Sequence, residues 1–357
     1  MVNVTKTYLP NKEIYIKYID EIYKSGKITN NGPLVQKLEK RLAKYLGVKN
    51  IVLVSNGTSA LEIAYRTLDI KDFAITTPFS FVATTSSLVT NGIKPIFCDI
   101  DKDTLCIDAS KIADKITKST SAIVPVHVFG NACNVEAIDK IAKENNLKVI
   151  YDAAHAFGVK YKDKSILNYG DISILSFHAT KLFHTIEGGA LVVNDESLVQ
   201  KAKFLRNFGI DGQESIPDLG TNAKMNEFEA AMGLCMLDEI DTILAKREEL
   251  WHNYYVSLKD IVKLQIRDES ATNNFGYFPV IFKNEQECLK VKLALNKKDI
   301  YPRRYFYPSL DSLNYIEPKQ YMPNSRDISS RILCLPLYPT MPKDVQSLII
   351  SIIKDNI

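Results

Sequence analysis

The segment ISILSFHATKLFHTIEGGALVVND, residues 172–195, joins two short apolar runs through a polar connection. The runs ISIL at 172 and ALVV at 190 have the length and composition of β-strands. Five similar runs occur earlier in the chain, namely IVLV at 51, FAIT at 73, PIFC at 95, AIVPV at 122 and KVIY at 148. Such continuous apolar runs indicate strands that are buried on both faces.

Helical or loop stretches alternate with these seven runs. This alternation predicts an α/β fold whose seven-stranded sheet is mostly parallel and is connected by helical crossovers. Ahead of the first strand, the stretch LVQKLEKRLAKYLG from residue 34 predicts an amphipathic helix that ends at Gly47, because leucines recur there at helical spacing.

The pattern changes after about residue 240. There the sequence predicts a helix ending near Tyr255, a strand at YFPVIF, a helix over 285–296, a stretch rich in Pro and Tyr from 301 to 340, and a last helix at VQSLIISIIKD. We therefore expect two domains: a large domain over residues 1–240 and a smaller α+β domain over residues 241–357.

Composition excludes several classes of protein. The 45 basic and 42 acidic residues are mixed along the chain, so we expect no nucleic acid partner. No apolar stretch reaches the roughly 18 residues of a membrane span and no signal core is present, so we expect no membrane association and a cytoplasmic location. The six cysteines lack the spacing of a metal site and are interpreted as reduced thiols, and no metal is expected.

Ligands of parallel sheets bind beyond the carboxyl ends of the strands, and polar residues stand at these positions here. Asp152 follows the strand at 148, where a lone carboxylate in a cleft needs a cationic partner such as a protonated pyridine nitrogen. Lys181 follows the strand at 172. A lysine that forms a Schiff base needs a partly desolvated site that lowers its pKa, and the end of a buried strand supplies one.

Two further strand ends add to this set. Gly57 and Thr58 open a helix after the first strand, where free backbone N–H groups make a site for an anion such as phosphate. Phe81 follows the second strand and offers an aromatic face to a planar ring. A phosphate site, a ring platform, a partner for a ring nitrogen and a Schiff-base lysine therefore occur in one chain.

Each of these residues alone has an ordinary explanation. A lone lysine is mostly exposed, a lone aspartate is mostly a cap, a lone phenylalanine is mostly core, and small residues often begin a helix. His155 and His178 fit structural roles equally well, and Glu187 with its two following glycines fits a turn. The combination of these residues favours a ligand site, because four independent ordinary explanations would otherwise have to coincide at four strand ends.

At these residues the sequence closely resembles the sugar aminotransferases of the DegT/DnrJ/EryC1/StrS family, a branch of the fold-type I pyridoxal phosphate (PLP) enzymes. The resemblance covers nearly the whole chain. It is carried most specifically by VIYDAAHAFGV and SFHATKLFHTIEGGALVVND, and further by SNGTSALEIA, TPFSFVATTSS, NAKMNEFEAAMG and RRYFYPSL.

The resemblance implies roles for individual residues around PLP. Lys181 is expected to hold the cofactor as a Schiff base and to move protons as the catalytic residue, and Asp152 to pair with the pyridine nitrogen. His155 is expected near the ring hydroxyl, with Phe81 against the ring.

The resemblance also implies phosphate contacts from Gly57, Thr58 and Ser176. Asn222 looks like the residue that reaches the phosphate of the neighbouring subunit, although Lys224 could align there instead. An active site shared in this way implies a homodimer.

The reaction implied is transfer of an amino group from glutamate to a nucleotide-linked keto sugar, with dTDP-4-keto-6-deoxyglucose giving dTDP-4-amino-4,6-dideoxyglucose as the leading expectation. One alternative is amination of a dTDP-3-keto-6-deoxyhexose. Another is a non-catalytic regulatory relative. This alternative is disfavoured because such a protein need not keep Lys181, Asp152 and Ser176 together. A nicotinamide-dependent dehydrogenase is disfavoured because the chain contains no Gly-x-Gly. A branch of the family that replaces the lysine by histidine and removes a hydroxyl is disfavoured by Lys181.

Later segments offer charge and stacking to the nucleotide and sugar. The candidate substrate-binding residues are Glu187, Arg303, Arg304, Tyr305 and Tyr307. A packed, partly exposed aromatic loop explains the last four almost equally well.

Overall fold

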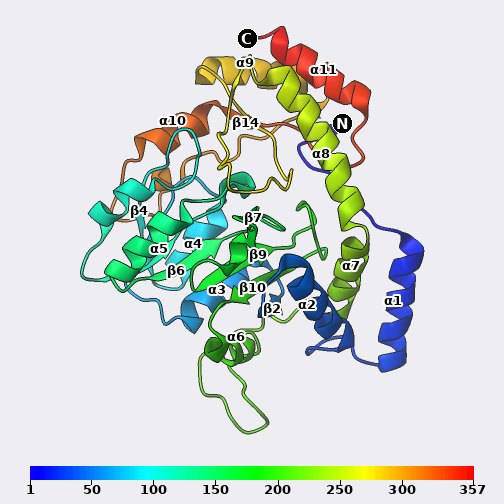
Figure 1. Ribbon diagram of the computed structural model, residues 1–357, viewed down its shortest axis with the longest axis vertical. Helices are drawn as coiled ribbons and strands as arrows, with labels where there is room; N and C mark the ends of the chain where they lie inside the picture. Colours follow the sequence, from blue (N-terminus) through cyan, green and yellow to red (C-terminus); the bar gives the residue numbers. More distant parts are fainter.

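A computed structural model describes residues 1–357 and is built around one seven-stranded sheet (Figure 1). All seven predicted runs form its strands, in the spatial order β2-β10-β9-β6-β5-β3-β4. Strand β10 is antiparallel to both of its neighbours, and the other pairs are parallel. The mostly parallel sheet predicted from sequence is therefore confirmed. Its strands are β2 Ile51–Val54, β3 Phe73–Thr76, β4 Lys94–Phe97, β5 Thr120–Val124, β6 Lys148–Asp152, β9 Ile172–Ser176 and β10 Gly189–Val193.

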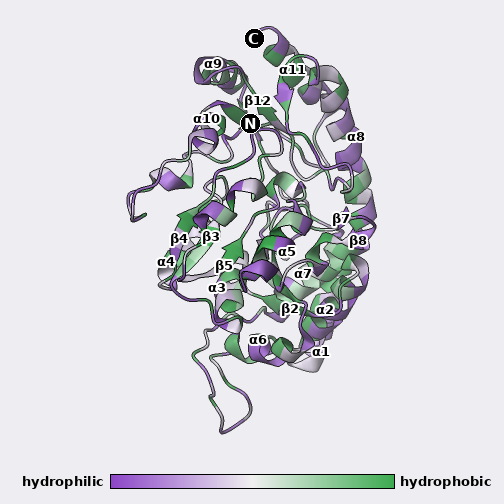
Figure 2. Cartoon of the chain, turned by 60° about the vertical axis from the view of Figure 1, so that its left-hand side comes forward, coloured by the Kyte–Doolittle hydropathy of each residue, from purple (hydrophilic) through white to green (hydrophobic).

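Helices cover both faces of this sheet, because successive strand residues point to opposite sides and both sides are apolar. In β2, Ile51 and Leu53 face one core while Val52 and Val54 face the other. Figure 2 shows hydrophobic residues concentrated in the strands between the helices. The helices on the first side are α2 Pro33–Leu46, α5 Val135–Glu144 and α7 Glu227–Asp238, and those on the second are α3 Gly57–Thr67, α4 Val82–Thr90 and α6 Val199–Leu205.

Helix α2 confirms the predicted amphipathic helix. It ends at Gly47, whose φ of 64° is the left-handed conformation that a helix-terminating glycine adopts. The residue before its first turn, Gly32, provides no side-chain cap. The carboxylate of Glu227 in α7 caps the helix instead, by accepting hydrogen bonds from the N–H groups of Leu34 and Val35 at 2.8 and 2.9 Å. The first helix of the chain, α1 Lys12–Ser25, packs beside α7 (Figure 1).

The C-terminal part of the chain forms a third core around a three-stranded antiparallel sheet of order β11-β12-β14. The predicted helix over 285–296 has these bounds in the structure, whereas the preceding helix extends three residues beyond Tyr255, to Leu258. The domain boundary at residue 240 stays a proposal. The elements are α8 Ile240–Leu258, β11 Lys263–Leu264, β12 Pro279–Ile281, α9 Glu285–Asn296, α10 Pro323–Arg331, β14 Ile332–Cys334 and α11 Lys343–Lys354.

Three smaller features complete the fold. The N-terminal strand β1 Val2–Asn3 pairs in parallel with β13 Ile300–Tyr301, and β7 Lys160–Tyr161 forms a hairpin with β8 Lys164–Ser165. The connection between α6 and α7 extends away from the body as a long loop (Figures 1 and 2). It carries exposed Phe208, Ile216 and Leu219. No helix combines the length and apolar character needed to cross a membrane.

Candidate active site

A cavity of about 350 Å³ opens at the carboxyl edge of the seven-stranded sheet. The strand ends of β2, β6 and β9 meet there, as expected for ligand sites of such sheets. The cavity brings together nearly all the predicted cofactor residues. Those that line it are Gly57, Thr58, Phe81, Asp152, His155, Ser176 and Lys181.

Asp152 ends β6 as a buried carboxylate with no cation in contact. Its Oδ2 accepts a hydrogen bond from the Thr84 hydroxyl at 2.7 Å, and its Oδ1 accepts one from the Ala154 N–H at 3.1 Å. Burial raises the pKa of Asp152, while these two hydrogen bonds and the charge of Lys181 lower it. A positively charged ligand group beside Asp152 would hold it ionised.

Lys181 lies five residues beyond the end of β9 and is only partly exposed. Desolvation by burial lowers the pKa of its amine to about 8, against the opposing attraction of Asp152. Its Nζ donates a hydrogen bond to the Tyr277 hydroxyl at 3.2 Å. Near neutral pH this lysine therefore exists in both its charged and its neutral form, as a nucleophile or a proton carrier requires.

The start of α3 forms the predicted anion site. The Asn56 side chain caps the helix by accepting from the Ser59 N–H at 2.8 Å, which leaves the N–H groups of Gly57 and Thr58 without a helical partner. Glycine at 57 permits close approach to β9, since a Cβ there would lie 2.9 Å from the Cβ of Ser176. The Ser176 hydroxyl and the helix amides thus lie together at one end of the cavity.

His155 and Phe81 lie on the walls of this cavity. Phe81 is 56% exposed at the start of α4, so one ring face is available to a ligand. His155 is buried and its Nδ1 accepts from the Phe129 N–H at 3.3 Å, which leaves the hydrogen of the neutral ring on Nε2. Burial also keeps the pKa of His155 well below its usual value, so the ring is neutral.

The candidate substrate residues divide into two groups. Glu187, Arg303 and Tyr305 line the cavity, and Glu187 lies 3.5 Å from Nε2 of His178. Arg304 and Tyr307 do not line it. Instead the Arg304 guanidinium pairs with Glu285 of α9 at 2.6 Å and packs 3.6 Å from the centre of the Tyr307 ring. Within one chain, these two side chains pack against each other and beside α9.

Comparison with known proteins identifies the family. The model of the DegT/DnrJ/EryC1/StrS aminotransferase family matches residues 11–354. The chain belongs to this family. The prediction of the family, of an enzyme and of the aminotransferase class is thereby confirmed.

Individual relatives of this DegT/DnrJ/EryC1/StrS aminotransferase match over nearly the whole chain. A dTDP-4-amino-4,6-dideoxy-D-glucose transaminase of Shigella dysenteriae is 45% identical, over 99% of this chain and 98% of its own length. An Escherichia coli protein of the same name is 36% identical, over 96% and 95%. The crystal structure of DesI in the presence of its TDP-sugar product matches with a TM-score of 0.94 at 30% identity, covering 99% of this chain and 92% of that one.

Three residues in or next to the aminotransferase cavity were not predicted from the sequence. Thr84 bonds to Asp152 from α4, and Tyr277 and Phe306 reach the cavity from the C-terminal part of the chain. Phe306 stacks on His155, with ring centroids 5.6 Å apart and an interplanar angle of 2°. Thr84 lies in the motif TPFSFVATTSS, three residues after Phe81, so its position in the sequence was a signal. Phe306 lies in the motif RRYFYPSL, between the candidates Tyr305 and Tyr307, whereas Tyr277 lies in none of the motifs that carry the resemblance.

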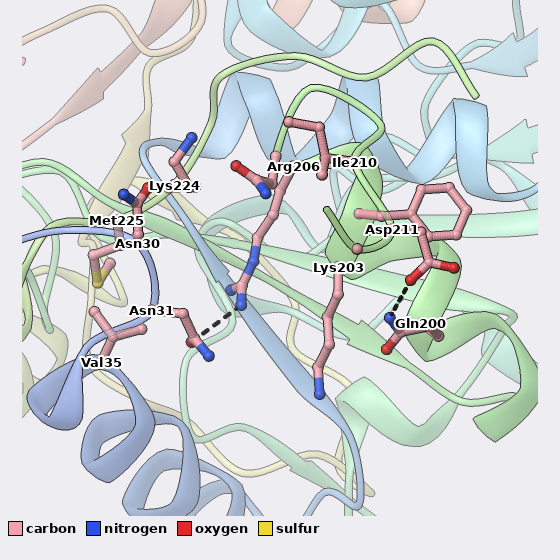
Figure 3. A pocket seen from close by; sticks show the side chains of 13 residues that line it. Asn30, Asn31, Val35, Gln200, Lys203, Arg206, Ile210, Asp211, Lys224 and Met225 are labelled. Atoms are coloured by element: carbon pink, nitrogen blue, oxygen red, sulfur yellow. Dashed lines mark hydrogen bonds between the residues drawn. The ribbon is translucent and has the colours of Figure 1, made fainter. Parts of the chain in front are cut away.

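Asn222 does not line this cavity but contacts a residue of a second one. The second cavity has a volume of about 260 Å³ and is drawn in Figure 3. The Asn222 Oδ1 accepts a hydrogen bond at 2.7 Å from Lys224, which lines the second cavity together with Arg206 and Asn31. Figure 3 shows Arg206 donating to the Asn31 side chain, at 3.3 Å. The second cavity contains neither Lys181 nor Asp152, so we place the active site in the first. The role of Asn222 toward a neighbouring subunit stays a prediction.

Proposed function

We propose that this chain is a PLP-dependent aminotransferase that transfers the amino group of glutamate to dTDP-4-keto-6-deoxyglucose. The placement of Lys181 and Asp152 in one cavity carries the cofactor assignment. The names of the relatives that are 45% and 36% identical over nearly their whole lengths support the substrate.

The residues of the cavity fit PLP. The buried Asp152 carboxylate forms no ion pair and feels the charge of Lys181 only at a distance, and a protonated pyridine nitrogen would supply a cation in direct contact. The amides of Gly57 and Thr58 with the Ser176 hydroxyl suit a phosphate, and glycine at 57 keeps that space open. Phe81 would lie against the ring, and His155 would approach its hydroxyl. Lys181, with a pKa of about 8, is available as the attachment point.

Lys181 would act twice, first by binding PLP and then, as a free amine, by moving a proton at the substrate carbon. When bound, PLP supplies an electron sink for the negative charge that develops at that carbon. A pKa of about 8 lets the Lys181 amine accept this proton and return it near neutral pH. Asp152 would keep the facing nitrogen protonated. Thr84 and the Ala154 N–H hold the carboxylate in place.

Arg303, Tyr305 and Glu187 are proposed substrate contacts because they line the same cavity. Arg303 carries a positive charge and stands with its guanidinium carbon 5.2 Å from the centre of the Tyr305 ring. This pair offers charge to the phosphates of a nucleotide and an aromatic face to its base or sugar.

The decisive experiment is incubation of the purified protein with PLP, glutamate and, in separate reactions, dTDP-4-keto-6-deoxyglucose or a dTDP-3-keto-6-deoxyhexose. Mass spectrometry and NMR identify the product. Amination at C4 is the expected result, and turnover of the 3-keto sugar alone would move the substrate while keeping the chemistry. Lys181→Ala is the matched control, since it should abolish turnover while leaving the fold intact. Retained activity in Lys181→Ala would refute the assignment of the lysine.

A further inference from the structure

The segment Asn274–Tyr277 crosses from the C-terminal part of the chain to the active-site cavity. Asn274 is buried, and its Nδ2 donates to the carbonyl oxygens of His155 at 2.8 Å and Phe157 at 3.0 Å. Its Oδ1 accepts from the Gly276 N–H at 3.2 Å. One amide side chain thus ties this segment to the loop that follows β6, which contains His155 and begins directly after Asp152.

Helix α8 fixes the same segment from the other side. Arg247 is buried and forms no ion pair, and its guanidinium donates to the carbonyl oxygens of Gly276 at 3.3 Å and Leu337 at 3.0 Å. Burial lowers the pKa of Arg247 to about 10, so placing a cation here costs free energy. Gly276, the residue before Tyr277, is therefore anchored to α8 through Arg247 and, through Asn274, to the loop that follows β6.

Tyr277 uses this anchored position to reach the catalytic lysine. Its hydroxyl accepts the hydrogen bond of Lys181 Nζ at 3.2 Å, and its ring packs 4.7 Å from the ring of His155. Burial raises the pKa of the Tyr277 phenol far above its usual value, so the group stays a neutral hydroxyl. It is the only hydrogen-bond partner of Lys181 Nζ in the structure.

We propose that Tyr277 is a positioning residue that holds the free amino group of Lys181 at a fixed place in the active site. This inference rests on the proposed role of Lys181. The function of the segment Asn274–Tyr277 is then to carry one hydroxyl to that amine. Because an acceptor stabilises the charged form of an amine, the hydrogen bond also opposes the desolvation of Lys181.

The test measures the pKa of the Lys181 amine in the cofactor-free protein, through the pH dependence of its acetylation. Wild type and Tyr277→Phe are labelled with acetic anhydride over a series of pH values, and mass spectrometry follows the peptide that contains Lys181. The labelling midpoint of wild type is expected near the pKa of about 8. In Tyr277→Phe the midpoint should fall by roughly one pH unit, because the ammonium loses its acceptor. A midpoint equal to that of wild type would overturn the proposal.

Tyr254→Phe is the matched control. Tyr254 is a buried tyrosine in the same part of the chain, and its hydroxyl donates to the Pro336 carbonyl at 3.1 Å, away from the cavity. Its removal should leave the labelling midpoint of Lys181 unchanged. Asn274→Ala, which loosens the segment, should shift the midpoint in the same direction as Tyr277→Phe. A shift in Tyr254→Phe as large as that in Tyr277→Phe would mean a general loss of packing.

With PLP and both substrates, Tyr277→Phe should lower kcat roughly tenfold while KM stays within about twofold, as expected for a residue that orients the proton carrier. A raised KM with unchanged kcat would contradict a positioning role. Failure of the proposed function can be told apart from failure of this inference. If the proposed function is wrong, PLP does not attach covalently to Lys181 of the wild type, whatever the labelling shows for Tyr277→Phe.

Discussion

Burial of the charged Lys181 amine lowers the free energy of unfolding of the cofactor-free protein, and the size of this effect depends on pH. In the cofactor-free protein the pKa of Lys181 is lowered from 10.5 to about 8. Below about pH 8 the amine is charged in both the folded and the unfolded chain, so the cost of burying the charge is fully present. Between about pH 8 and 10.5 the unfolded chain binds more protons, and the cost disappears as pH rises.

Lys181→Met should therefore raise the melting temperature of the cofactor-free protein most at about pH 7 and progressively less toward about pH 10. Methionine is similar in length but never charged, which isolates the ionisation. Differential scanning calorimetry of both proteins across this pH range checks the prediction. A difference in melting temperature that does not vary with pH would show that the charge of Lys181 does not destabilise the folded protein.

At the scale of elements, the close contact between the start of α3 and the end of β9 keeps the proposed phosphate site open. Gly57→Ala would place a methyl group 2.9 Å from the Cβ of Ser176. We expect the Kd for PLP to rise roughly tenfold or more, since an amide and a hydroxyl would be displaced from the anion. Absorbance titration measures this Kd. In the control Gly158→Ala the new methyl meets nothing within 4 Å, so stability should fall through the positive φ of 73° with little change in Kd.

Elements of the large sheet were predictable because burial on both faces leaves a simple trace in the sequence. The runs at 51 and 172 became β2 and β9 for this reason. Helix α10 was not predicted because its sequence PNSRDISSR has few apolar residues and its position depends on contacts with distant parts of the chain, such as α9 and Asp99. The neighbours Arg303 and Arg304 looked equivalent, but only Arg303 lines the cavity. The direction of each side chain depends on the strand and helices around it, which no local pattern records.

At the scale of the whole molecule, the long loop between α6 and α7 carries apolar side chains that one chain does not bury. Ile216 is 70% exposed and Leu219 is 77% exposed. We propose that a second copy covers them in a homodimer, in which Asn222 near the base of the loop approaches the neighbouring active site. The double variant Ile216→Asp, Leu219→Asp should then dissociate more readily and lose activity on dilution.

Multi-angle light scattering across a dilution series measures this dissociation. Leu348→Asp is the control, because Leu348 is 41% exposed on α11 and lies outside the loop. It should leave the mass unchanged. A wild-type protein that scatters as a monomer at every concentration would contradict the proposed assembly, and equal dissociation of both variants would remove the loop from it.

Trp251 is the one tryptophan of the chain, and it lies on α8 beside the anchored segment. Its indole packs against Tyr255 at 5.3 Å and edge-on to Phe278 at 5.4 Å, directly after Tyr277 in sequence. The protein therefore has an intrinsic fluorescent probe that packs against the C-terminal core, next to the segment Asn274–Tyr277. Its emission reports on the surroundings of that segment in the native chain, with no label attached and with no second indole to confuse the signal.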